Sequence, residues 1–168
     1  AIGELDISFV APDISGPIAG IKVDSVLPQV SGDVTVPGSR TYVTGEDLTF
    51  TVTFDEVVNS TNATLPLTIG SNARSAVLAT PSGTGTTTLT FEYTIAADDR
   101  DSDGIAVDPT AIVGSVTDDA GNQADFSTAT SQSTTGVLVN TAAVTAVTVT
   151  PSADGTYKTG DVLTLSVA

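Results

Sequence analysis

Residues 48–54 read LTFTVTF, and apolar side chains alternate with threonine along them. A period of two places the apolar side chains on one face of a strand and the threonines on the other. Residues 86–95, TTTLTFEYTI, repeat the pattern. One apolar and one polar face per strand is typical of antiparallel sheets that cover a core with one side only. The alternation therefore predicts an all-β protein.

Turn signals divide the chain into seven strands of this kind. Short strands separated by regularly spaced glycine, proline, asparagine and aspartate indicate a β-sandwich. The expected strands are residues 30–36, 47–58, 65–70, 73–80, 86–95, 105–113 and 124–139, the last one interrupted.

The chain also repeats itself. Residues 41–52, TYVTGEDLTFTV, return as TYKTGDVLTLSV at residues 156–167, and GIKVDS at residues 20–25 matches GVLVNT at residues 136–141. The first pair is offset by 115 residues and the second by 116. An offset of about one domain length predicts a tandem array.

The repeat divides the chain into three parts. Residues 24–141 are expected to form one complete repeat. Residues 1–23 are then the C-terminal end of a preceding repeat, and residues 142–168 are the first strands of a following one.

The chain is strongly acidic, with 20 acidic residues against 5 basic ones and a net charge of −15. Such a surface repels phosphate backbones and anionic lipid surfaces, so neither nucleic acid nor a membrane is an expected partner. No run of 18 apolar residues is present for a membrane span. The charge favours cations as partners.

Histidine and cysteine are absent. Their absence excludes a zinc site, a thiol nucleophile and a Ser-His-Asp triad. Paired carboxylates could still hydrolyse a glycan, but that chemistry needs a substrate cleft, and aromatic residues make up only 5% of the chain. We expect no enzymatic activity.

The strongest motif is DRDSDG at residues 99–104. It matches the D-x-D-x-D-G opening of a calcium loop, in which alternate carboxylates bind the ion and glycine permits the turn. An EF-hand is excluded because Thr110 stands where its glutamate would be. A calcium loop of another kind and a solvated acidic turn both remain. The candidate ligands are Asp98, Asp99, Asp101, Asp103 and Asp108.

A second acidic group emerges from the expected topology. Counting strand reversals in a sandwich of the immunoglobulin type places DDAGN, residues 118–122, at the end where the chain enters the repeat, which we call the proximal pole. DDAGN alone is an ordinary turn sequence. The shared position makes a second calcium site a hypothesis, with the candidate ligands Asp24, Asp55, Glu56, Asp118, Asp119 and Asn122.

The opposite end, where the chain leaves, is the distal pole. There the loop 98–103 is expected beside Asn140. Acidic loops at both poles would then face neighbouring repeats, either in the same chain or in an assembly. Asn59 and Asn62 each begin an N-x-[ST] sequon in one predicted loop, so glycosylation there is a further hypothesis.

Several of these stretches together resemble bacterial immunoglobulin-like repeats of giant surface adhesins, of the biofilm-associated and RTX type. Residues 44–58, TGEDLTFTVTFDEVV, are similar to the opening TGDTLTFTVTFDEAV of such repeats, and GTGTTTLTFEYTI at residues 83–95 is similar to their strand SGTTTLTFTYTV. DSDGI at residues 101–105, followed by DDAGN, resembles their pair DADGI and DAAGN. VLVNT at residues 137–141 resembles their closing linker GVLVDTTAP.

The resemblance implies an extracellular spacer that calcium makes rigid, with Asp24 as the linker ligand. At the second junction Asn140 stands in place of the usual aspartate, so that junction is expected to bind calcium less tightly or to bend more. Two other functions remain open. One is a subunit of an extracellular filament or surface layer, and the other is a carbohydrate- or surface-binding module, which should display exposed aromatic rings.

Overall fold

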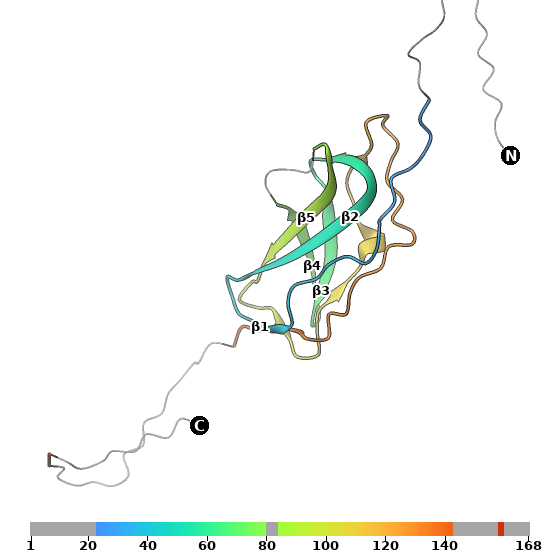
Figure 1. The fold of residues 1–168 in the computed structure, drawn as a ribbon. Coiled ribbons are helices and arrows are strands. Elements are labelled where there is room, and N and C mark those ends of the chain that lie inside the picture. Colours follow the sequence, from blue (N-terminus) through green and yellow to red (C-terminus); the bar gives the residue numbers. More distant parts are fainter. Residues whose placement is uncertain (1–22, 80–83, 143–157, 160–168) are drawn as a thin grey trace, which may run out of the picture.

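The computed structural model of the protein describes residues 23–79, 84–142 and 158–159. These residues contain nine strands and one short 3-10 helix (Figure 1). The strands are β1 (Arg40–Tyr42), β2 (Asp47–Ser60), β3 (Thr64–Ile69), β4 (Asn72–Leu78), β5 (Thr86–Thr94), β6 (Arg100–Asp101), β7 (Ala106–Val107), β8 (Val116–Thr117) and β9 (Val137–Asn140), and the helix is η1 (Pro109–Ala111).

The strands form two sheets that pack as a sandwich. The larger sheet has the order β7-β3-β4-β5-β2-β8, and the smaller one has the order β1-β9-β6. Neighbours in the larger sheet are antiparallel, and β1 pairs with β9 in parallel. The predicted all-β sandwich, consistent with an immunoglobulin-like fold, is confirmed.

The core is built on the alternation of β2. Leu48, Phe50 and Val52 are completely buried, whereas the threonines between them are exposed or half-buried. Phe50 pairs across the sheet with Phe91 of β5, which is also fully buried. Each such side chain contributes about 1.5–3 kcal/mol through burial. The apolar face of β2 therefore holds the two sheets together.

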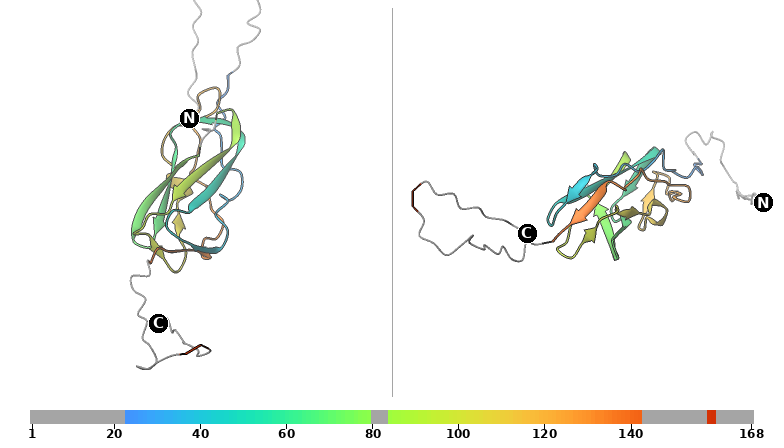
Figure 2. Two further views of the ribbon diagram at one scale, coloured as in Figure 1. Left: turned by 90° about the vertical axis from the view of Figure 1, so that its left-hand side faces the viewer. Right: turned by 90° about the horizontal axis from the view of Figure 1, so that it is seen from below.

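The chain enters and leaves the sandwich at opposite ends (Figures 1 and 2). Residues 23–28 approach at the end that carries the 118–122 loop, and Asn140 to Ala142 leave beside the loop before β6. Isolated bridges attach the incoming segment: Val30 pairs with Phe54, and Thr35 pairs with Thr51. The expected proximal and distal poles are thus present in the structure.

Three predicted strands differ from the structure. The expected strand 30–36 forms only isolated bridges at Val30, Val34 and Thr35, and the first strand is β1, which the sequence did not predict. The expected strand 105–113 is wrong in its second half, because β7 ends at Val107 and η1 follows. Pro109 has no N–H to offer a ladder, and the Asp108 carboxylate caps the turn by accepting from the Thr110 N–H at 3.1 Å. Of the expected strand 124–139, only β9 forms a ladder, and single bridges attach the residues before it.

Two assignments fall outside the described residues. Residues 1–22, assigned to a preceding repeat, are not described, and neither are residues 143–168 of the following one, apart from Lys158 and Thr159. Among the residues that are described, no helix has the length and apolar character needed to cross a membrane.

Candidate cation site at the proximal pole

Three carboxylates from distant parts of the sequence meet at the proximal pole. Asp24 belongs to the incoming segment, Glu56 lies in β2, and Asp118 follows β8. One carboxylate oxygen of each lies within 4.8 Å of the others, and the described residues contain no other group of this kind. Two oxygens bound to one ion at about 2.3–2.6 Å are at most about 5 Å apart. The spacing therefore suits one hard divalent cation.

Glu56 joins the group because of its position in the alternation of β2. The even-numbered side chains of β2 face inward, and Glu56 is the ionisable one among them. Its Oε1 is buried and has no hydrogen-bond partner among the described residues. Burial raises the pKa of Glu56 above its ordinary value, and the nearby charges of Asp118, Asp24 and Asp55 raise it further. A bound cation would supply the partner that this oxygen lacks.

Asp118 is held in place by its own turn. Its Oδ1 accepts from the backbone N–H of Asn122 at 2.8 Å, and its Oδ2 accepts from the Asn122 side-chain amide at 2.7 Å. Burial alone would raise the pKa of Asp118, but these hydrogen bonds outweigh it and hold the pKa below its ordinary value. The same amide also donates to the Asp24 carbonyl at 3.1 Å. Asn122 thereby binds the Asp118 carboxylate and the backbone of Asp24 at the same time.

Two other candidates of the proximal pole lie outside the cluster. Asp55 is exposed and accepts from the Gln29 N–H at 2.8 Å, which attaches the incoming segment to β2. Asp119 is exposed and accepts from the Asn59 amide at 2.8 Å. Of the six expected ligands, the structure thus brings three together, namely Asp24, Glu56 and Asp118. Asn122 supports two of these three by hydrogen bonds, and Asp55 and Asp119 have other partners.

At the distal pole, Asp99 is buried in a network of protein donors. Its carboxylate accepts from Arg74 Nε at 2.8 Å, from the Tyr93 hydroxyl at 2.7 Å and from the Ala96 N–H at 2.9 Å. Burial acts to raise the pKa of Asp99, but these partners lower it below its ordinary value. Burial and the hydrogen bond to Asp99 raise the pKa of Tyr93 to about 12. Asp98 forms the second ion pair of Arg74, at 2.9 Å.

The remaining carboxylates of this loop also have local partners. Asp101 accepts from the N–H groups of Gly70 and Gly104, each at 2.7 Å, and from that of Asp103 at 3.2 Å. Asp103 itself is exposed, and Asp108 caps η1. Calcium binding by this loop stays a prediction, and the structure assigns the oxygens of Asp99 and Asp101 to protein donors.

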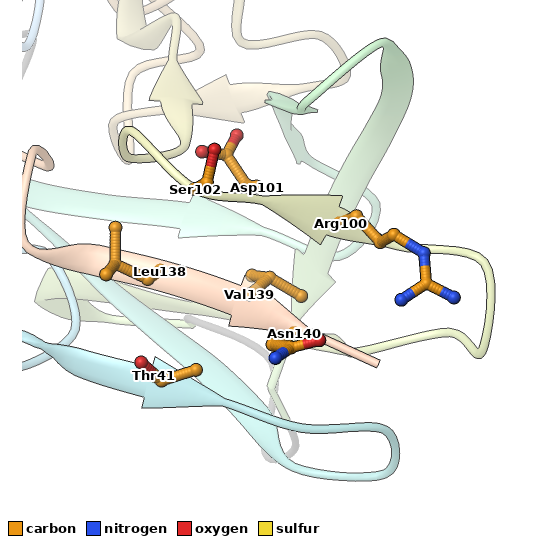
Figure 3. Close-up of a pocket in the computed structure, with 7 residues that line it drawn as sticks. All are labelled: Thr41, Arg100, Asp101, Ser102, Leu138, Val139 and Asn140. Atoms are coloured by element: carbon orange, nitrogen blue, oxygen red, sulfur yellow. The ribbon is translucent and has the colours of Figure 1, made fainter. Parts of the chain in front are cut away.

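Asn140 lies where the chain leaves, on the outer face of the smaller sheet. It is the cross-strand partner of Arg100, and both line a shallow hollow of about 450 Å³ together with Thr41 and Leu138 (Figure 3). Its Oδ1 accepts from the Ala142 N–H at 3.0 Å. The expected position of Asn140 beside the 98–103 loop is therefore confirmed.

The two sequons differ in how their amides are used. Asn59 donates to Asp119 and accepts from the Gly85 N–H at 2.8 Å, so both ends of its amide are engaged. Asn62 accepts from the Ser115 N–H at 3.0 Å. Glycosylation stays a prediction at both positions.

Sequence reasoning missed Arg74 and Tyr93, the partners of Asp99. Both lie on predicted strands, and their contacts with Asp99 span 25 and 6 residues of sequence. The small number of basic residues could have pointed to Arg74. In a chain with 5 basic and 20 acidic residues, a basic side chain on a strand is expected to pair with an acidic loop.

Comparison with protein-family models, with curated proteins and with solved structures finds no match to this chain. The resemblance to adhesin repeats therefore remains a hypothesis carried by the quoted stretches.

Proposed function

We propose that this chain is a structural spacer repeat of a large extracellular surface adhesin, and that calcium binds at its proximal pole. The observation that carries the proposal is the convergence of Asp24, Glu56 and Asp118, with a buried Glu56 oxygen that has no donor. Three anionic oxygens are the ligands that Ca²⁺ prefers, and a loop carbonyl or water would complete its shell.

The position of the site supports a mechanical role. Asp24 belongs to the incoming segment, whereas Glu56 and Asp118 belong to the sandwich. Without a metal the three charges would repel one another, and among the described residues only the hydrogen bond from the Asn122 amide to its carbonyl would hold Asp24 at the pole. When all three carboxylates are ligands of one cation, the segment is held against the proximal pole. A preceding repeat would then be held at a defined angle.

The aromatic residues weigh against a carbohydrate-binding module. Tyr42, Phe50, Phe54 and Phe91 are buried, and Tyr93 and Phe126 are half-buried. The described part of the chain therefore presents no exposed aromatic ring on which a sugar could stack.

Calorimetric titration of the full chain with calcium tests the proposal. We expect one ion to bind at the cluster. Glu56→Gln keeps the shape of the side chain and removes its charge, so affinity should fall about tenfold or more. Magnesium should bind more weakly, because it demands octahedral geometry and retains its waters.

Asp119→Asn is the matched control. It removes one carboxylate from the same loop but leaves the cluster and the Asn59 contact in place. Its calcium affinity should be close to that of the unaltered chain. Equal affinity in the Glu56→Gln and unaltered chains would reject this site. The absence of any heat of binding at two well-separated temperatures would reject calcium altogether, because a near-zero enthalpy at one temperature does not persist at another.

A further inference from the structure

Arg100 is the one arginine in the described part of the chain that has no hydrogen-bond or ion-pair partner there. Arg40 is paired with Glu46 at 2.9 Å, and Arg74 is paired with Asp98 and Asp99. The Arg100 side chain is exposed and extends from β6 past Asn140, at the rim of the hollow on the smaller sheet (Figure 3). In a chain with a net charge of −15, a free guanidinium beside the outgoing segment needs an explanation.

The two linkers of the chain share one local hydrogen bond. Asp24 and Asn140 occupy equivalent positions in the repeated stretches GIKVDS and GVLVNT. In both linkers the side-chain Oδ1 accepts from the N–H two residues later: Val26 donates to Asp24 at 3.1 Å, and Ala142 donates to Asn140 at 3.0 Å. The incoming linker is therefore a template for what the outgoing linker meets.

The template shows which loop approaches Asn140. At the proximal pole the Asn122 amide donates to the Asp24 carbonyl at 3.1 Å, so the 118–122 loop rests on the linker. In a tandem array, the equivalent loop of the following repeat would rest on Asn140. Arg100 is the direct cross-strand partner of Asn140, and such partners are about 4.5–5.5 Å apart at Cα. The loop that reaches Asn140 therefore comes within reach of Arg100.

The start of the outgoing linker is fixed on the distal pole. The Thr141 hydroxyl lies 2.8 Å from the Ala97 carbonyl and 2.6 Å from the Asp99 carbonyl, so it is held against the loop that leads into β6. Ser25, a hydroxyl residue, stands at the equivalent position of the incoming linker. The chain therefore leaves from a fixed point next to Arg100.

The approaching loop carries an exposed acid suited to Arg100. Asp119 is exposed, and only its Oδ1 has a partner, the Asn59 amide. It lies outside the Asp24–Glu56–Asp118 cluster, so a cation bound there would not take it up as a ligand. A guanidinium opposite such a carboxylate provides a charge-assisted hydrogen bond.

We propose that the outer face of β6 and β9 is the docking surface for the proximal pole of a following repeat, and that Arg100 forms an ion pair with the acid at the position of Asp119 in that repeat. This inference deepens the proposed function and rests on its tandem arrangement. It adds a second contact across the junction that does not require a cation. Each junction is then held by two different interactions, one of which survives the removal of calcium.

The test uses the chain with its repeat duplicated in register, residues 1–141 followed by residues 26–168. The chain has no cysteine, so Ser75→Cys in both copies places a spin label on the exposed side of β4 in each. Pulsed electron–electron double resonance in chelator measures the distribution of distances between the two labels. The width of this distribution reports how much the angle between the copies varies. Arg100→Glu in the first copy should broaden the distribution and lower the docked population roughly threefold.

The same substitution in the second copy is the matched control, because residues 142–168, which follow it there, contain no counterpart of the 118–122 loop. Its distribution should equal that of the unaltered duplicate. Combining Arg100→Glu in the first copy with Asp119→Arg in the second should restore the narrow distribution. Equal widths in the unaltered and first-copy variants, or failure of the charge swap to restore the width, would overturn the docking proposal. Because the measurement is made without calcium and calorimetry uses the single chain, failure of one proposal leaves the other standing.

Discussion

At the scale of single residues, the inward carboxylates of this protein occupy two contrasting environments. Asp99 accepts hydrogen bonds from Arg74, Tyr93 and a backbone N–H, whereas Glu56 has an oxygen with no donor at all. The first carboxylate stabilises the fold when it is charged, and the second opposes the fold when it is charged. Substitutions and pH should therefore affect the two in opposite directions.

Replacing Asp99 by asparagine should destabilise the protein. Asp99→Asn leaves the Arg74 guanidinium without its buried partner and weakens the acceptor of Tyr93, so the free energy of unfolding should fall by about 2–4 kcal/mol. Urea denaturation measures the change. Asp98→Asn is the control, because Asp98 contacts the same arginine but its side chain is 72% exposed, and it should cost less than about 1 kcal/mol. Equal effects of the two variants would contradict the assigned role of Asp99.

In chelator, stability should pass through a maximum as the pH is lowered. Because the pKa of Glu56 is raised in the folded protein, Glu56 adds to the free energy of unfolding in full below its ordinary pKa of 4.5. This stabilisation is lost as the pH rises through the raised value. Because the pKa of Asp99 is lowered in the folded protein, Asp99 adds to the free energy of unfolding in full above its ordinary pKa of 3.8. This stabilisation is lost as the pH falls through the lowered value. Unfolding free energy should therefore rise as the pH is lowered towards 4.5 and fall again as the pH drops below 3.8.

Glu56→Gln separates the two limbs of this profile. The variant should lack the rise on acidification, because glutamine does not titrate, and it should keep the fall at low pH. Urea denaturation at a series of pH values, in chelator, provides the measurement. A rise of unchanged size in the variant would show that another carboxylate causes it.

At the scale of elements, the acidic motif of the distal pole shapes a turn. Asp101 accepts from the Gly104 N–H, and the Ile105 N–H then donates to the Val137 carbonyl at 3.2 Å, which joins the turn to β9. Gly104 has a φ of 109°. A side chain there would be strained, and a Cβ would lie 2.5 Å from the Thr134 carbonyl oxygen. Asp101 and the final glycine of the motif are thus explained by the turn that they form, whereas Asp99 pairs with Arg74 and Tyr93 and Asp103 is exposed.

Gly104→Ala should therefore destabilise the protein more than a glycine substitution in an open turn does. The strained φ costs about 1–3 kcal/mol, and the contact with Thr134 adds to it. Gly121→Ala is the control, because its φ of 92° carries the same kind of strain but no atom lies within 4 Å of the added Cβ. Thermal unfolding should show the larger loss for Gly104→Ala. Equal losses would mean that the close approach to Thr134 is not maintained in solution.

At the scale of the whole molecule, the main feature is that the chain passes from one acidic pole to the other (Figure 2). Successive repeats would meet pole to pole through linkers of a few residues. Charges in such a gap repel one another within a Debye length of about 8 Å at physiological salt. Calcium would convert some of them into shared ligands, whereas the Arg100 contact would act with or without it.

An array of three or more repeats should therefore be extended in millimolar calcium and more variable in shape in chelator. Small-angle scattering measures the maximum dimension and the flexibility in both conditions. The junction at Asn140 is an internal control, because asparagine keeps the turn through Oδ1 but offers no second anionic oxygen, so it should stiffen less than a junction with aspartate. The same dimensions with and without calcium would mean that the acidic poles serve solubility only.

The sequence by itself determined the fold class and the rough location of both poles. Strict alternation in LTFTVTF and TTTLTFEYTI is a local property, because a period of two follows from the geometry of a single strand. It correctly indicated β2 and β5, and counting reversals correctly placed Asp24 with the 118–122 loop. The same reasoning failed at residues 105–113, where Pro109 and its capping aspartate override the strand pattern.

Only the tertiary structure decided what each carboxylate does. The sequence ranked DRDSDG above the scattered acids of the proximal pole, because ligand motifs are recognised by local spacing. In the folded protein Asp99 meets Arg74 across the sheet, and Asp101 caps the turns at Gly70 and Gly104. Glu56, in contrast, meets Asp24 and Asp118 without a donor for its buried oxygen. Whether a carboxylate has a protein donor or is available to bind a cation depends on contacts between residues that are distant in sequence. Only the packing of the folded chain creates these contacts.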